Sequence, residues 1–195
     1  MTDAIETFEH NGFKVKLCLD PEPMNPRKEF DHFTTLACWH RRQNLGDAQI
    51  VPTSAKDLTE EMGEEDILAI LPLYIYEHGG ITMRTGAFSD QWDSGQVGWG
   101  YVTREQAKQL GSPPEGGESA QAYYERVIRE EVAEYDQYLT GQVYGYIVED
   151  EDGDHIDSCW GFYGDLDYVR TEAKSAAEHA RRPGQVDGAC NASCT

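Results

Sequence analysis

Residues 74–104 read YIYEHGGITMRTGAFSDQWDSGQVGWGYVTR and combine aromatic, glycine and polar side chains. The last third of this stretch, GQVGWGYV at 95–102, recurs as GQVYGYIV at 141–148 with one glycine shifted. Both segments are rich in β-branched and aromatic residues, which predicts two strands that lie side by side in one sheet. We expect their glycines where a neighbouring backbone or a bulky ring approaches closely.

Hairpin signals flank these strands along the chain. Asn11-Gly12 separates two short alternating runs, and a reversal at Asp152-Gly153 leads into a returning strand. The apolar run at 67–76 predicts a buried strand, in which Pro72 indicates an edge or a bulge.

Helical spacing of apolar residues is clearest over 119–139 and predicts a long helix there. A second helix is expected over about 164–181, capped by Asp165. These elements predict an α+β fold, a mostly antiparallel hairpin-built sheet with helices packed on one face.

The length of 195 residues favours one domain, or one domain with a long excursion. We expect a single domain over 1–181 and a flexible tail over 182–195 that contains Cys190 and Cys194. The chain has five cysteines without a repeated spacing, which favours reduced thiols. No apolar run approaches the length of a membrane span and the N-terminus does not resemble a signal peptide, so a cytoplasmic protein is expected.

The formal charge of −20 is the strongest global feature of the sequence. Residues 115–157 hold 13 acids, and their only basic residues are Arg126 and Arg129. Such a field repels phosphate and argues against nonspecific binding to nucleic acid or to an anionic membrane. Two interpretations stay open: a solvated acidic face, in keeping with a salt-rich cytoplasm, or a surface that imitates the phosphate backbone of DNA.

Catalytic and metal sites have weaker signals. Cys38, His40, His78, His155 and Cys159 fit no zinc spacing, and neither a metal nor a cofactor is expected. The acidic turn at 150–154 resembles a calcium loop, but Gly161 stands where the twelfth ligand is needed. Ser94 and Cys159 are possible nucleophiles without a local signature that would place a base beside them.

Two further groups of residues admit a binding role or a plain structural one. Trp39-His40-Arg41-Arg42 is the one dense basic cluster of the N-terminal half and suits an anion or carboxylate, although pairing of the two arginines with neighbouring acids is the favoured interpretation. Aromatic residues on the expected central strands, close to Asp93, Gln96 and Gln142, suit either a small-molecule pocket or an ordinary core. These residues are Trp92, Trp99, Tyr101, Tyr144, Tyr146, Trp160 and Tyr163.

Six sequence blocks stand out: DPEPMNPR at 20–27, CWHRRQNLGD at 38–47, YEHGGITM at 76–83, QWDSGQVGWGYV at 91–102, YDQYLTGQVYGYIVEDED at 135–152 and DSCWGFYGD at 157–165. Together they resemble a protein family carried by phages and plasmids of bacteria and archaea. The resemblance spans residues 12–165, departs at 30–33, where a Trp-Asp-Asn-Leu-like segment is expected, and excludes the tail.

The resemblance implies a setting on a mobile element and supplies no catalytic residues. Accessory proteins of such elements are often inhibitors of CRISPR or restriction systems, and several are strongly acidic. This association favours an anti-CRISPR or antirestriction DNA mimic that binds a nucleic-acid-binding defence protein of the host. The expected partner-binding residues are Glu125, Glu130, Glu131, Glu134, Asp150, Glu151, Asp152 and Asp154.

Two alternatives stay open beside this hypothesis. One is a hydrolase or transferase that acts on a nucleotide or small metabolite in an aromatic-lined pocket, with His40, Arg41, Asp93 and Gln96 as its functional residues. The other is a structural or regulatory accessory protein. The sequence names neither the partner nor the oligomeric state.

Overall fold

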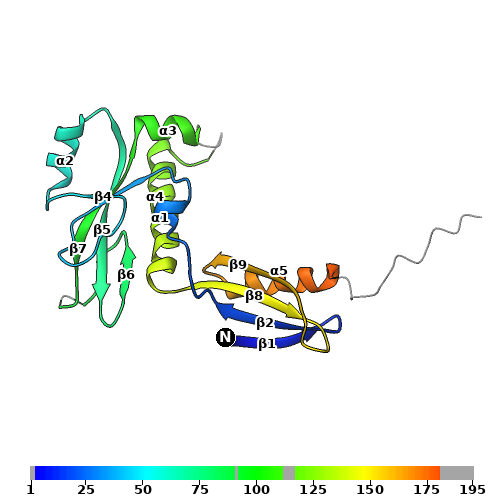
Figure 1. Cartoon of the computed structure of the whole chain (residues 1–195). Helices are drawn as coiled ribbons and strands as arrows, with labels where there is room; N and C mark the ends of the chain where they lie inside the picture. Colours follow the sequence, from blue (N-terminus) through cyan, green and yellow to red (C-terminus); the bar gives the residue numbers. More distant parts are fainter. Residues whose placement is uncertain (1–2, 91, 112–116, 181–195) are drawn as a thin grey trace, which may run out of the picture. The chain divides into compact units, whose positions relative to one another are not determined.

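The computed structural model describes residues 3–90, 92–111 and 117–180 (Figure 1). Its contacts divide the chain into two compact units, unit 1 (Met1–Pro21 and Val143–Thr195) and unit 2 (Glu22–Gln142). Helices and strands occur in both, so the predicted α+β class is confirmed. The single domain over 1–181 stays a prediction, and the tail expected over 182–195 lies outside the described residues.

Unit 1 is a four-stranded antiparallel sheet with one helix packed against it. The strand order is β1 (Ala4–His10), β2 (Phe13–Leu19), β8 (Val143–Glu149) and β9 (His155–Tyr163). Alternate residues of β2 and β8 face α5 (Leu166–His179), whose small alanines let the helix approach the sheet closely. This core contains Phe13, Val15, Leu17, Tyr146, Val148, Val169, Ala173 and Ala177.

The two hairpins of unit 1 are the predicted ones. Asn11 and Gly12 have φ angles of 53° and 78°, the left-handed pair that a tight two-residue turn between twisted strands requires. Gly153, with φ of 86°, occupies the reversal between β8 and β9. The turn chemistry read from the sequence is therefore confirmed at both positions.

Unit 2 is built on a five-stranded mixed sheet. Its strand order is β4 (Ala48–Gln49), β3 (Thr35–Cys38), β7 (Ser94–Thr103), β5 (Ile67–Glu77) and β6 (Ile81–Arg84). The β3–β4 pair is parallel and the other pairs are antiparallel. β6 pairs only with residues 74–77 of β5, so Pro72 lies where β5 has no partner on that side, as its missing N–H requires.

Helices cover both faces of the unit 2 sheet. The long α4 (Ala120–Leu139), which begins at its N-cap Ser119 as predicted, buries its apolar stripe on one face. The sequence predicted helices on one face, but the short α2 (Ala55–Met62) also packs on the other, where Leu58 contacts Ala37 and Tyr101. β7 makes both layers possible because its successive side chains are apolar on both faces.

Two short helices complete unit 2. α1 (Pro26–Glu29) follows the proline-rich loop, and α3 (Arg104–Leu110) begins in a capping box formed by Thr103 and Gln106. Within the described residues, no helix is both long and apolar enough to cross a membrane.

The two echoing strands do not lie side by side, so that prediction was wrong. β7 is enclosed between β3 and β5 in unit 2, and β8 between β2 and β9 in unit 1. The expectation about their glycines is confirmed at Gly98, Gly100 and Gly145, whereas Gly95 and Gly141 have nothing within 4 Å of an added Cβ. A Cβ at Gly98 would collide with the Ala37 carbonyl oxygen, and one at Gly145 would collide with the Trp160 ring.

A matched pair of substitutions in β7 tests this packing. Gly98→Ala forces its methyl group against the β3 backbone, and we expect it to lower the free energy of unfolding by about 1–3 kcal/mol. Gly95→Ala meets nothing within 4 Å and should change stability by less than about 0.5 kcal/mol. Urea denaturation measures both, and equal midpoints would contradict the close approach.

Candidate functional site

The proline-rich loop places one arginine inside unit 2. Asn25 caps α1 by accepting a hydrogen bond from the Arg27 N–H at 2.9 Å, and Pro26 starts the helix with its fixed φ angle. Arg27 then points inward, and only 3% of its side chain is exposed. A charged group so deeply buried needs partners for every donor.

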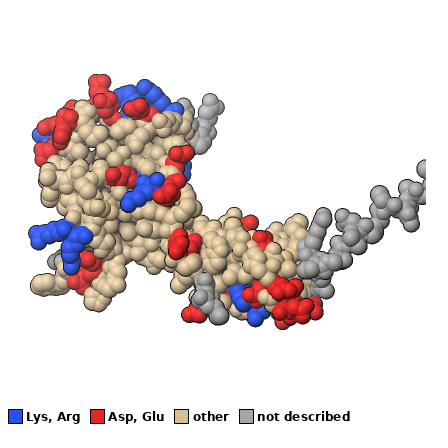
Figure 2. All heavy atoms as spheres, viewed as in Figure 1, with Lys and Arg blue, Asp and Glu red and all other residues tan. Residues whose placement is uncertain are grey.

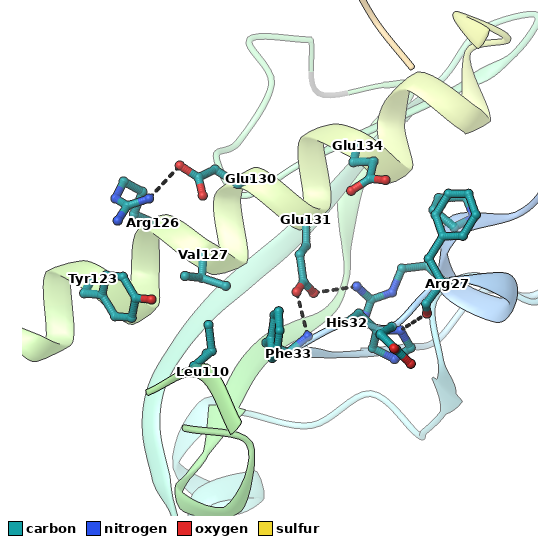
Figure 3. Close-up of a pocket in the computed structure, with 13 residues that line it drawn as sticks. Arg27, His32, Phe33, Leu110, Tyr123, Arg126, Val127, Glu130, Glu131 and Glu134 are labelled. Carbon is teal, nitrogen blue, oxygen red and sulfur yellow. Dashed lines mark hydrogen bonds and ion pairs between the residues drawn. The ribbon is translucent and has the colours of Figure 1, made fainter. Parts of the chain in front are cut away.

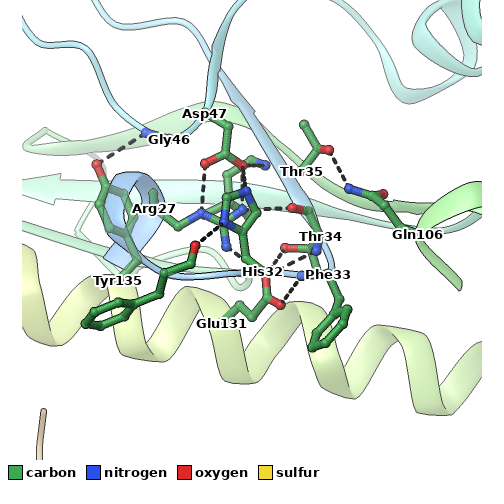
Figure 4. A network of polar contacts seen from close by, with 12 residues as sticks. Arg27, His32, Phe33, Thr34, Thr35, Gly46, Asp47, Gln106, Glu131 and Tyr135 are labelled. Atoms are coloured by element: carbon green, nitrogen blue, oxygen red, sulfur yellow. Dashed lines mark hydrogen bonds and ion pairs between the residues drawn. The ribbon is translucent and has the colours of Figure 1, made fainter. Parts of the chain in front are cut away.

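Two carboxylates and one carbonyl supply those partners (Figure 4). Arg27 donates through Nε to Asp47 at 2.8 Å and through Nη1 to Glu131 at 2.7 Å, and a second bond from Nη2 completes a fork on Asp47. Nη2 also donates to the Thr34 carbonyl at 2.8 Å. Burial by itself would lower the pKa of Arg27, but the bonds to the two carboxylates raise it, so the guanidinium stays charged.

The same carboxylates hold the surrounding backbone. Glu131 accepts from the N–H of Phe33 at 2.7 Å and from the N–H and hydroxyl of Thr34, and Asp47 accepts from the Leu36 N–H at 2.7 Å. The segment that leads into β3 is therefore bonded to the middle of α4. We name this cluster the Arg27 network.

A cavity of about 420 Å³ lies beside the Arg27 network, against α4 (Figure 3). Its wall combines three α4 carboxylates with the rings of two phenylalanines and a tyrosine, the apolar side chains of Leu110 and Val127, and the arginines Arg27 and Arg126. We name it the α4 pocket. The carboxylates are Glu130, Glu131 and Glu134, and the rings are Phe30, Phe33 and Tyr123. Carboxylates next to ring faces form a surface that suits a cation.

One arginine of the wall is bound by the groups beside it. The Arg126 guanidinium lies over the Tyr123 ring at 5.2 Å and donates to Glu130 at 2.8 Å and to Glu118 at 2.9 Å. The α4 pocket thus holds one guanidinium through a ring and carboxylates together, and Glu130 is partly neutralised by it.

Glu134 differs from the other two glutamates of the pocket. It makes no ion pair with any described residue and is half-buried. Burial raises its pKa, the nearby Glu131 raises it further, and Arg27 opposes both effects. A carboxylate whose charge is disfavoured in the free protein gains most when a cation arrives.

The remaining predicted acids lie elsewhere. Glu125 forms an ion pair with Arg129 one turn along α4, outside the pocket wall. The other four belong to the β8–β9 turn of unit 1, where Figure 2 shows carboxylates gathered. Asp150 builds this turn by accepting from the N–H groups of Asp152 and Asp154, whose own side chains face solvent.

The residues of the enzyme alternative come together only in part. His40, Arg41 and Asp93 line a second cavity of unit 2, whereas Gln96 is not part of its wall and donates to the Gly98 carbonyl at 3.2 Å. Ser94 lines this cavity too, but its hydroxyl donates to the Asp90 carbonyl. A nucleophilic serine would instead donate to a catalytic base.

The central aromatic residues belong to different units. Tyr101 is buried under α2 and the Trp99 indole donates to the Thr53 carbonyl, both in unit 2. Tyr146 is buried against α5 in unit 1, beside Tyr144. The core interpretation therefore holds for these rings, while Trp92 stands apart from any core.

Among the described side chains, no group of three or more His, Cys, Asp or Glu residues lies close enough together to hold a metal ion. Cys38 is buried, and burial raises the pKa of its thiol to about 12, which keeps it protonated. Cys159 and His155 belong to β9 in unit 1, whereas Cys38, His40 and His78 belong to unit 2.

Comparison of the chain with protein-family models, with curated proteins and with solved structures finds no match in any of the three. The resemblance to a phage and plasmid family stays a prediction.

Sequence reasoning missed the centre of this site. Arg27 is followed 20 residues later by Asp47 and 104 residues later by Glu131, separations without any periodic signal. The pocket rings Phe30 and Phe33 belong to the segment between α1 and β3, which has no regular pattern in the sequence. The one available signal was the proline-rich loop that immediately precedes Arg27.

Removal of the buried cation tests the Arg27 network. Arg27→Ala leaves Asp47 and Glu131 without their guanidinium, and we expect a loss of about 3–5 kcal/mol in the free energy of unfolding. Arg104→Ala is the control, because this arginine is exposed and its side chain donates to the Glu65 carbonyl without an ion pair to any described residue. Chemical denaturation compares the two, and similar losses would contradict a central role for Arg27.

The raised pKa of Glu134 predicts a pH-dependent stability. Ionised Glu134 disfavours the folded state, so Glu134→Gln should raise the melting temperature at pH 7. The gain should fade as the pH falls below about 4, where the wild-type carboxyl is protonated in both states. Glu64→Gln, at an exposed position, is the control, and an equal gain there would refute a local effect.

Proposed function

We propose that this protein is a non-enzymatic inhibitor, encoded by a mobile element, that binds a nucleic-acid-binding defence protein in the host cytoplasm. The partner would be a CRISPR effector or a restriction enzyme. The observation that carries the proposal is the convergence of α4 carboxylates and aromatic rings on one cavity, in a chain of net charge −20.

The α4 pocket would take a lysine or arginine side chain that the partner otherwise uses to hold a phosphate. Such a cation gains charge-assisted hydrogen bonds from Glu134 and Glu130 and ring contacts from Phe33 and Tyr123. The contact of Arg126 with Tyr123 and Glu130 supports this geometry, because it joins the same kinds of groups within the chain.

The net charge would act before contact is made. The negative field of the protein attracts a basic surface of the partner and raises the association rate. Salt screens this field and therefore slows association. The exposed carboxylates of Glu151, Asp152 and Asp154 give unit 1 an acidic surface of its own, which would meet further basic residues of the partner.

The contacts within unit 2 narrow the expected partner-binding set. Glu131 accepts hydrogen bonds from Arg27 and from two backbone N–H groups, so its carboxylate is already occupied. Glu125 does not line the α4 pocket. Direct contact with the partner on α4 would then fall to Glu130 and Glu134.

The proposal is tested in strains that each contain one defined CRISPR or restriction system, with phage plating efficiency as the measurement. We expect the protein to relieve one system, and the purified protein to displace DNA from its effector less well as salt rises. Glu130→Lys with Glu134→Lys should weaken displacement at least about tenfold, a loss of about 1.4 kcal/mol.

Glu61→Lys with Glu64→Lys is the matched control, because it makes the same charge change at exposed positions outside the pocket. Equal inhibition by the pocket variant and the parent would refute the α4 pocket as the contact. Loss of inhibition on Asp93→Ala, in a variant that still folds, would instead favour the enzyme alternative.

A further inference from the structure

A second cavity of unit 2 has the opposite chemistry from the α4 pocket. It measures about 1020 Å³ and lies between the segment after β3, the segment after β4 and the adjoining ends of β5 and β7. We name it the tryptophan cleft, because Trp39 and Trp92 line it together with the basic cluster at 40–42. Its wall shares no residue with the α4 pocket.

The apolar part of the cleft combines buried aliphatic side chains with one exposed indole. Ile75 and Val97, both buried, contribute to its wall, while the side chain of Trp92 is 95% exposed. Indoles bury a large apolar area when they find a partner, and this exposed indole lines a cavity together with a cationic cluster. Trp92 therefore presents a face on which another flat ring can stack.

The cations of the cleft differ in their availability. Arg42 donates to Glu77 at 2.9 Å, whereas no ion pair joins Arg41 to any described residue. Arg41 is exposed, and its guanidinium retains all its donors for a ligand. A planar guanidinium is the side chain best suited to a phosphate, which it grips through two parallel bonds.

The other polar groups of the cleft are fixed in place. The Gln43 N–H donates to Nδ1 of His40 at 3.1 Å, so neutral His40 has its proton on Nε2, which faces Glu77 at 3.7 Å. Asp93 pairs with Nδ1 of His78 at 2.9 Å. The oxygens of Glu77 and Asp93 have further lone pairs that accept from ring N–H or amino groups.

We propose that the tryptophan cleft binds a free mononucleotide. The base would stack on Trp92, the phosphate would bond Arg41, and amino or N–H groups of the base would donate to Glu77 or Asp93. A ring that combines N–H donors with a phosphate matches all three features at once. A polynucleotide does not, because a chain of charge −20 repels its many phosphates. The inference is independent of the inhibitor function.

Titration of the full-length chain tests the proposal, with tryptophan fluorescence and calorimetry as readouts. The probes are the four ribonucleoside monophosphates, their nucleosides, inorganic phosphate and a short single-stranded DNA. We expect at least one monophosphate to bind with a Kd below about 1 mM, and its nucleoside to bind about tenfold more weakly. Phosphate alone should leave the fluorescence unchanged.

Two variants and two controls locate the site. Trp92→Ala and Arg41→Ala should each weaken nucleotide binding about tenfold. Trp160→Ala removes a partly exposed tryptophan of unit 1, and Arg129→Ala removes an exposed arginine of α4, so both should bind as the parent does. Circular dichroism confirms that each variant is folded.

Three results would overturn the proposal: no monophosphate binds at millimolar concentration, Arg41→Ala binds as tightly as the parent, or the DNA oligonucleotide binds more tightly than every mononucleotide. The first result would show that the cleft binds no mononucleotide, and the second that Arg41 does not contact the phosphate. The third would show that the preferred ligand is a nucleic acid.

Discussion

The buried guanidinium of Arg27 is the interaction on which unit 2 depends. A charge with 3% of its side chain exposed is tolerated only because two carboxylates and a carbonyl satisfy its donors. Those carboxylates also bond the backbone that leads into β3, so one cation joins α1, the β3–β4 loop and α4. Apolar packing is non-directional and would permit several similar arrangements of these segments. A polar network in which every group has its partner fixes one of them.

The α4 pocket follows from this arrangement. Glu131 is held inside the network, which leaves Glu134 beside it as a half-buried carboxylate without an ion pair among the described residues. The charge of Glu134 lowers the stability of the folded state and at the same time favours a cationic ligand. Binding sites often retain such a group for function at the expense of stability. The tryptophan cleft lies in the same unit and presents an exposed indole and an exposed arginine.

Local sequence accounts for most of the elements. Asn11-Gly12 and Asp152-Gly153 set their turns because left-handed φ angles suit these residues, and Ser119 caps α4 through its side chain. The predicted DNA-mimicking acids illustrate the limit of composition. All eight share a charge sign and an exposed or half-buried position, yet Glu131 and Asp150 use their oxygens to bind neighbouring backbone N–H groups.

The sequence by itself determined the α+β class, the two hairpins of unit 1 and the long helix, because each depends on residues near in the chain. Only the tertiary structure decided that the echoing strands β7 and β8 belong to different sheets, and that Arg27, Asp47 and Glu131 meet. Strand partners and buried ion pairs depend on contacts across long separations in the chain, for which local periodicity contains no signal.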